Sequence, residues 1–244
     1  MKKTVLLSLI LLFALLFYAP ISRAVPSLTL KTGQSTNITA EEVAAKYVQA
    51  IGGIEALKKI NTKKVRYRVH MFGRDGYVME RQWKRPDNMR QGSPDGPMYT
   101  LTEGMKSWRV TPEGRREMPG PVSANFAKLA DIDGPLVDYE KKGISLEYVG
   151  NERYDMTELH HLKMTFKDGV EWDLYFDAGS GFLRKMKQPS FYMVNNEISR
   201  GPDSWTYYYD YRSVENINIP HLWIQEVSED HIHAFVVEEV SLNK

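Results

Sequence analysis

An alternation of apolar and polar residues with a period of two is the feature that most constrains the fold of this chain. Residues 65–71, 162–166 and 170–176 follow it, with an apolar residue at every second position. In a strand this period places successive side chains on opposite faces, so each segment predicts a strand with one apolar face. Short turn sequences such as Asp75-Gly76 and Lys167-Asp168-Gly169 join these strands. Strands joined by tight turns pair with each other in antiparallel fashion, so the sequence predicts a long antiparallel meander.

Short helical segments accompany the predicted strands. Thr39-Ala40-Glu41-Glu42 has the residues of a capping box, and the apolar residues that follow share one helical face until Gly52-Gly53 ends the helix. Further short helices are predicted over residues 54–60 and 126–130. Another is predicted to begin at Pro135, because proline is favourable at the first position of a helix. A long meander with one apolar face must curl into a barrel or half-barrel to bury that face, and helices can cover its opening. The prediction is a mainly β fold with short helices.

The start of the chain has the pattern of a cleavable secretory signal. Lys2-Lys3 is followed by an almost unbroken apolar run over residues 5–18, and Ser22-Arg23-Ala24 offers small residues at the two positions that a signal peptidase recognises. The apolar run is shorter than the roughly 20 residues of a membrane-spanning helix, so no transmembrane segment is expected after cleavage. The predicted division is a signal peptide over 1–24, a linker or flexible arm over 25–38 and one domain over 39–244.

Composition excludes several classes of site. The chain has no cysteine, which excludes disulfides, thiol nucleophiles, thiolate metal sites and a lipid-modified cysteine anchor. The 32 Lys and Arg residues nearly balance the 31 Asp and Glu residues, for a net charge of +1. Such a balance provides no electrostatic surface for nucleic acid, so no nucleic-acid partner is expected. Neither a P-loop nor a dinucleotide-binding glycine motif is present, and no cofactor is expected.

Four short segments, taken in order, resemble one known superfamily. They are 47–57 (YVQAIGGIEAL), 84–90 (KRPDNMR), 134–139 (GPLVDY) and 209–214 (YDYRSV), the last followed by Ile219-Pro220-His221. Together they are similar to the LolA-like superfamily of periplasmic lipoprotein carriers, lipoprotein-binding outer-membrane proteins and their many uncharacterised relatives. The resemblance implies a curved antiparallel sheet, a half-barrel, closed by helices over an apolar cavity. It also implies an exported, soluble protein of the periplasm that binds acyl chains or another apolar ligand.

The apolar strand faces provide the candidate binding site. Acyl chains need only apolar area, at roughly 0.8 kcal/mol per buried methylene, and adaptable methionine side chains suit varied ligands. In one interpretation these side chains line a ligand cavity. In the other they form a closed core packed by the helices, because any half-buried sheet shows the same alternation. The predicted lining residues are Tyr67, Val69, Met71, Met79, Trp83, Leu162, Met164, Phe166, Trp172, Leu174 and Phe176.

The His231-Ile232-His233 segment, with Glu229 and Asp230 beside it, offers a second interpretation. Two histidines spaced H-x-H on a strand share one face and can form half of a zinc site. A third ligand does not stand at a recognisable spacing, and the sequence has neither a zinc-peptidase motif nor a G-x-S-x-G elbow. We therefore predict no enzyme and no metal site, and keep a metal-dependent periplasmic hydrolase as an alternative.

An aromatic strand offers a third interpretation. Trp205, Tyr207, Tyr209 and Tyr211 alternate on one predicted face, with Tyr208 on the other. Tyr and Trp combine apolar area with a polar tip, so the strand is either a docking platform or part of a sheet packed on both sides. The predicted function is an exported soluble binding or carrier protein for lipoprotein acyl chains or another apolar ligand in the cell envelope. The alternative to ligand binding is an interaction module that docks an envelope protein.

Overall fold

The computed structural model describes residues 38–71, 74–194, 197–228 and 231–244. The predicted signal peptide over 1–24, and the predicted arm over 25–38 except for Ile38, lie outside the described residues. The helices in the described part are α1 (Ala40–Ala50), α2 (Ile54–Lys58) and α3 (Gly120–Ala130). The strands are β1 (Thr62–Met71), β2 (Arg74–Lys84), β3 (Asn88–Gly92), β4 (Tyr99–Glu103), β5 (Lys106–Thr111), β6 (Gly114–Glu117), β7 (Ser145–Tyr154), β8 (Thr157–Thr165), β9 (Glu171–Asp177), β10 (Leu183–Val194), β11 (Glu197–Val214), β12 (Ile217–Ser228) and β13 (His231–Leu242).

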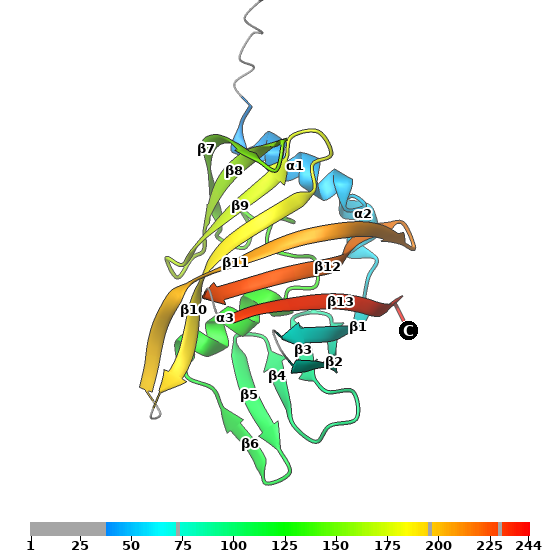
Figure 1. Cartoon of the computed structure of the whole chain (residues 1–244), viewed down its shortest axis with the longest axis vertical. Coiled ribbons are helices and arrows are strands. Elements are labelled where there is room, and N and C mark those ends of the chain that lie inside the picture. Colours follow the sequence, from blue (N-terminus) through cyan, green and yellow to red (C-terminus); the bar gives the residue numbers. More distant parts are fainter. Residues whose placement is uncertain (1–37, 72–73, 195–196, 229–230) are drawn as a thin grey trace, which may run out of the picture. The chain divides into compact units, whose positions relative to one another are not determined.

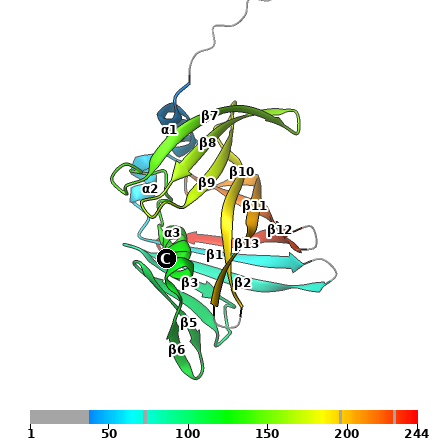
Figure 2. The ribbon, with the colours of Figure 1, turned by 90° about the vertical axis from the view of Figure 1, so that its left-hand side faces the viewer.

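These strands form one antiparallel sheet in the order β6-β5-β4-β3-β2-β1-β13-β12-β11-β10-β9-β8-β7. Two meanders, β1–β6 and β7–β13, join where β1 pairs with β13, with Val65 opposite Val240. Strands β6 and β7 stand at the two ends of this order. They do not pair with each other, so the sheet formed by the described strands is open. Figures 1 and 2 show it curving around the side on which the helices lie. The predicted mainly β fold with a curved half-barrel sheet is confirmed.

Helix α1 begins where the sequence predicts. The Thr39 hydroxyl accepts a hydrogen bond from the Glu42 amide at 3.2 Å, and the Glu42 carboxylate accepts one from the Thr39 amide at 2.8 Å. Val43 and Val48 on one side of the helix are buried against the inner face of the sheet. None of the described helices is long and apolar enough to cross a membrane.

Removing the cap should weaken this helix. Thr39→Ala leaves the first-turn amide without its partner and is expected to lower the free energy of unfolding by about 1 kcal/mol. Thr39→Ser keeps the hydroxyl oxygen and should stay within a few tenths of a kcal/mol of the original protein. Urea unfolding of the two variants checks this, and an equal loss in both would show that the methyl group, rather than the cap, carries the effect.

The segment between α3 and β7 forms turns instead of the helix predicted to begin at Pro135. Gly134 and Asp138 have positive φ angles of 80° and 53°, which a right-handed helix cannot contain. Leu136 and Val137 of this loop are nonetheless buried, because they pack onto the same cluster as α1. The loop therefore serves as part of the cover of the sheet.

Apolar side chains form two buried clusters on the inner face. The larger one lies between α1, α2, the loop after α3 and strands β8–β10, and Leu162 and Phe176 are at its centre. The smaller one lies along β1 and β13, where the ring of Tyr67 is 5.2 Å from that of Trp223 and 5.8 Å from that of Phe235. The smaller cluster thus consists of side chains from strands, whereas the larger one also contains side chains of the helices and of the loop.

Candidate ligand-binding cavity

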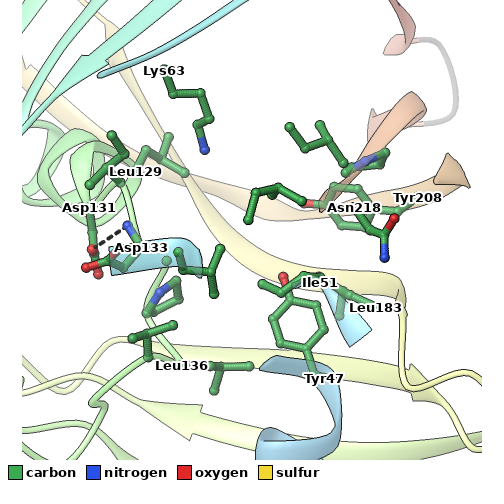
Figure 3. A pocket seen from close by; sticks show the side chains of 18 of the residues that line it. Tyr47, Ile51, Lys63, Leu129, Asp131, Asp133, Leu136, Leu183, Tyr208 and Asn218 are labelled. Atoms are coloured by element: carbon green, nitrogen blue, oxygen red, sulfur yellow. Dashed lines mark hydrogen bonds between the residues drawn. The ribbon is translucent and has the colours of Figure 1, made fainter. Parts of the chain in front are cut away.

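A cavity of about 290 Å³ lies between the inner face of the sheet, the three helices and the loop after α3. Figure 3 shows the Lys63 amine and the Tyr47 hydroxyl pointing into it. Apolar side chains make most of its wall: Ile51, Leu57, Ile60, Leu129, Ile132, Leu136, Val137, Leu174, Leu183, Met186, Ile217 and Ile219. The cavity therefore offers an apolar interior with a few polar groups, which is the usual character of a small-molecule site.

The structure distributes the predicted lining residues over three places. Three of them border the cavity: Trp83, Trp172 and Leu174. Four pack in the larger cluster away from the cavity wall: Leu162, Met164, Phe166 and Phe176. Four belong to or pack against the smaller cluster: Tyr67, Val69, Met71 and Met79. The alternation identified a continuous inner face, and the cavity occupies one part of it.

Other lining residues were not predicted: Tyr47, Lys63, Arg81, Tyr208 and Tyr211. Lys63 stands two positions before Val65 and so continues the inward-facing period of β1. Across the strand pair it lies directly opposite Trp83. The sequence thus carried a signal for Lys63, although a charged residue at the end of an apolar period is normally taken as solvent-facing.

Two cations lie beside one aromatic ring on the β1–β2 wall. The Lys63 ammonium is 4.2 Å, and the Arg81 guanidinium 5.5 Å, from the centre of the Trp83 ring. The indole N–H of Trp83 donates to the carbonyl of Leu129 at 2.8 Å, which fixes the ring between sheet and α3. Burial, together with the nearby charge of Arg81, lowers the pKa of Lys63 to about 8. Lys63 therefore stays charged at neutral pH, in a site that disfavours the charge.

The tyrosines of the cavity are neutral polar groups. Burial raises the pKa of Tyr47 to about 12 and raises the pKa values of Tyr208 and Tyr211 further. The hydroxyl of Tyr211 donates to the carbonyl of Leu183 at 2.9 Å. Tyr47 and Tyr208 can donate hydrogen bonds to a ligand, whereas the Tyr211 hydroxyl can only accept one, and none of the three adds negative charge to the site.

Two carboxylates border the cavity, and each already has a cationic partner. Asp133 pairs with Arg85 at 2.5 Å, and Asp131 pairs with Lys142 at 2.5 Å. Burial raises the pKa of Asp131 in spite of the Lys142 charge. Both aspartates therefore hold the loop in place; their charges also favour the Lys63 ammonium from a distance, but neither forms an ion pair with it.

The histidines do not assemble a metal site in the described part of the chain, where no group of three His, Cys, Asp or Glu side chains has suitable geometry. His231 instead hydrogen-bonds the Ser228 hydroxyl at 2.8 Å, and His161 contacts the Asp173 carboxylate at 2.8 Å. Glu229 and Asp230, which the sequence places beside the pair, lie outside the described residues. The structure thus offers no further ligand for a zinc ion held by His231 and His233 among the residues it describes.

The aromatic strand β11 divides its rings differently from the prediction. Tyr208 and Tyr211 both border the cavity, because the positive φ of 52° at Asp210 reorients the strand between them. Trp205 and Tyr207 lie elsewhere and stack with ring centres 6.3 Å apart. The expectation that Tyr211 shares a face with Trp205 and Tyr207 is therefore wrong.

The sequence matches no protein-family model and no curated protein. A LolA superfamily protein from Nitrosomonas europaea superposes with a TM-score of 0.56 and 14% identity, over 85% of this chain and 94% of that one. A domain described as an outer membrane lipoprotein-sorting protein, from Vibrio parahaemolyticus, gives 0.55 and 10%, over 84% and 92%.

A third solved structure agrees with these two. A DUF1329 family protein from Desulfovibrio piger gives a TM-score of 0.53 at 10% identity, over 84% of this chain and 93% of that one. Each match spans nearly the whole of the solved chain, so the likeness concerns the complete architecture of sheet and helices. Structural similarity at identities this low shows a shared fold, but it does not identify a ligand. The chain therefore has a LolA-like fold.

Proposed function

We propose that the protein is an exported carrier that binds an acyl chain or another apolar ligand in the cavity between the sheet and its helices. The observation that carries the proposal is the cavity itself, about 290 Å³ of space with a mostly apolar wall, in a LolA-like fold. The signal-like segment at residues 1–24 supports export to the periplasm. The Vibrio structure described as a lipoprotein-sorting domain supports an apolar ligand in this fold.

The size and surroundings of the cavity favour one chain as the ligand. Small-molecule sites usually have about 300–1,000 Å³, and this cavity is at the lower end of that range. Leu162 and Met164, which pack in the larger cluster away from the cavity wall, are completely buried, so side chains fill that part of the inner face. Each methylene that enters contributes roughly 0.8 kcal/mol, so a single apolar chain gains useful affinity without specific polar contacts.

Lipid uptake tests the proposal. Native mass spectrometry of the purified protein, with lipid extraction of the same sample, should reveal a bound amphiphile or the uptake of an added one. Leu129→Trp places a larger side chain in the cavity and should lower this uptake at least tenfold. Val149→Trp, at a position that is 49% exposed on β7, introduces the same side chain outside the cavity and should leave uptake unchanged.

The outcomes separate the cavity from the rest of the protein. Loss of uptake in the Leu129 variant alone, with both variants folded by circular dichroism, supports ligand binding in the cavity. Equal uptake by both variants places the ligand elsewhere. No bound mass and no uptake in the original protein would mean that the protein is not a carrier of apolar ligands.

A second candidate function is docking of another envelope protein on β11. Trp205 and Tyr207 are only half-buried, and Tyr154 stacks on Tyr207 with ring centres 6.0 Å apart. Such a row of partly exposed aromatic rings is typical of protein interfaces. A pull-down from envelope extract that depends on Tyr207 supports this function, and it gains weight if lipid uptake fails.

A further inference from the structure

The β1–β2 wall of the cavity carries two cations that form no ion pair with the described residues. Lys63 and Arg81 both border the cavity, one on each strand, and each lies near the ring of Trp83. We propose that the ligand carries an anionic head group, which Lys63 and Arg81 bind next to Trp83 while its apolar chain fills the cavity. This inference rests on the proposed function, because it names the chemical class of the ligand of that same cavity.

Among the described residues, neither the Lys63 amine nor the Arg81 guanidinium forms an ion pair within 4.0 Å. The Nε of Arg81 donates to the side-chain oxygen of Gln91 at 2.7 Å, which orients the guanidinium with its two terminal nitrogens left for a ligand. Both side chains are half-buried. Charges that are partly removed from water are usually paired, so two unpaired cations on one cavity wall indicate an anion that is supplied from outside.

Each of the other charged side chains that line the cavity already forms an ion pair. Asp131 and Asp133 on the loop pair with Lys142 and Arg85, as described above. Lys128 on α3, the other lining cation, pairs with Asp168 at 2.5 Å. The tyrosines from α1 and β11 stay neutral because burial raises their pKa values. Lys63 and Arg81 thus give this part of the cavity a local positive charge.

The chemistry of the two cations fits an anionic head group. An ammonium and a guanidinium on neighbouring strands of one cavity wall suit a carboxylate or a phosphate, which the guanidinium can bind through two parallel hydrogen bonds. The apolar remainder of the wall suits one hydrocarbon chain. The ligand class is therefore a single-chain amphiphile with an anionic head, either a fatty carboxylate or an alkyl phosphate.

Three ligands with the same twelve-carbon chain test this class: dodecan-1-ol, dodecanoate and dodecyl phosphate. Isothermal titration of the purified protein at pH 7 measures their affinities, at concentrations below the micelle concentration of each anion and below the solubility limit of the alcohol. We expect at least one anion to bind about tenfold or more tightly than the alcohol, as a charge-assisted hydrogen bond predicts. The ratio between the two anions identifies the head group as carboxylate or phosphate.

Variants tie the preference to the two cations. Lys63→Met should lower affinity for the preferred anion about tenfold and leave the alcohol unchanged, and Arg81→Gln should act in the same direction. Lys64→Met is the matched control, because it removes the same charge from the next residue of β1, whose side chain points to the opposite face of the sheet. It should change neither affinity.

The pH dependence adds a readout that a structural role of Lys63 does not produce. The lowered pKa means that Lys63 of the unliganded protein loses its proton as the pH rises through about 8. A bound anion raises that pKa again, so the affinity for dodecanoate, whose charge is constant above pH 7, should be highest near pH 7 and fall between pH 8 and 10. Dodecan-1-ol binding, and anion binding to Lys63→Met, should not show this fall.

The outcomes distinguish failure of this inference from failure of the proposed function. If the alcohol and both anions bind equally, the cavity is a carrier site without head-group recognition, and this inference is overturned while the proposed function stands. Anion affinity that is unaffected by Lys63→Met and by pH would overturn it as well. If none of the three ligands binds, the proposed function fails and this inference fails with it.

Discussion

Phe176→Ala is expected to lower the free energy of unfolding by about 3–5 kcal/mol, as large-to-small changes of buried aromatic residues do. Phe176 is 1% exposed and lies in the larger cluster on β9. Its ring centre is 5.2 Å from that of Tyr47, so it holds α1 to the sheet. The variant loses the transfer energy of the ring and leaves a void that the neighbouring strands cannot close. Urea unfolding with linear extrapolation measures the loss.

An aromatic residue on the surface provides the control. Tyr77 on β2 is 46% exposed, and Tyr77→Ala should cost less than about 1 kcal/mol. Phe176→Leu keeps most of the volume and should cost less than Phe176→Ala. If Phe176→Ala costs no more than the Tyr77 variant, the ring is not part of a tightly packed core, and the larger cluster would have to be looser than the structure indicates.

Local patterns in the sequence were enough for most of the elements. The alternation around Tyr67 and Trp172 predicted strands because side chains in a strand point to opposite faces whatever the strand pairs with. The capping box at Thr39 predicted the start of α1 because both of its hydrogen bonds are formed within four residues. The turn sequences predicted antiparallel neighbours. These signals are short-range, and they are present before any tertiary contact forms.

Long-range features were less accessible. Nothing local in Val65 or Val240 indicates that β1 and β13 pair, which joins the two meanders into one sheet. The loop after Pro135 was predicted as a helix, since the positive φ angles of its neighbours Gly134 and Asp138 are imposed by the contacts of the loop. Pairing and loop shape depend on residues far apart in sequence, so a pattern with a short period cannot carry them.

The candidate site illustrates the same limit. Alternation assigned Val69 and Leu174 to one inner face. It could not predict over which part of that face the helices leave a cavity. Only Leu174 of these two borders the cavity. Lys63 continues the inward-facing period of β1. It was not predicted as a cavity residue because a lysine side chain usually lies in solvent. Which apolar residues enclose a cavity is decided by packing, and packing is a property of the assembled fold.

Arg85→Ala is expected to lower the free energy of unfolding by about 2–4 kcal/mol. The guanidinium binds both carboxylate oxygens of Asp133, at 2.8 and 2.5 Å, and donates to the carbonyls of Ile60 at 2.6 Å and Leu57 at 3.0 Å. It therefore ties β2, α2 and the loop after α3 together beside the cavity. Losing one partner of a buried pair costs about 3–5 kcal/mol, and the partial exposure of this pair, 27% and 14%, reduces that figure.

The alternative explanation is that any arginine in an ion pair behaves this way, and Arg212 tests it. Arg212 pairs with Asp210 at 2.6 Å, but the two side chains are 62% and 44% exposed, so Arg212→Ala should cost less than about 1 kcal/mol.

A double-mutant cycle of Arg85→Ala with Asp133→Asn separates the ion pair from the hydrogen bonds to the backbone carbonyls. If the loss in Arg85→Ala persists fully in the Asp133→Asn background, the bonds to Leu57 and Ile60 carry it. If it largely disappears, the ion pair is what holds the loop. A loss no larger than that of Arg212→Ala contradicts both, and it would mean that the loop over the cavity is held by its other contacts, the burial of Leu136 and Val137 and the ion pair of Asp131 with Lys142.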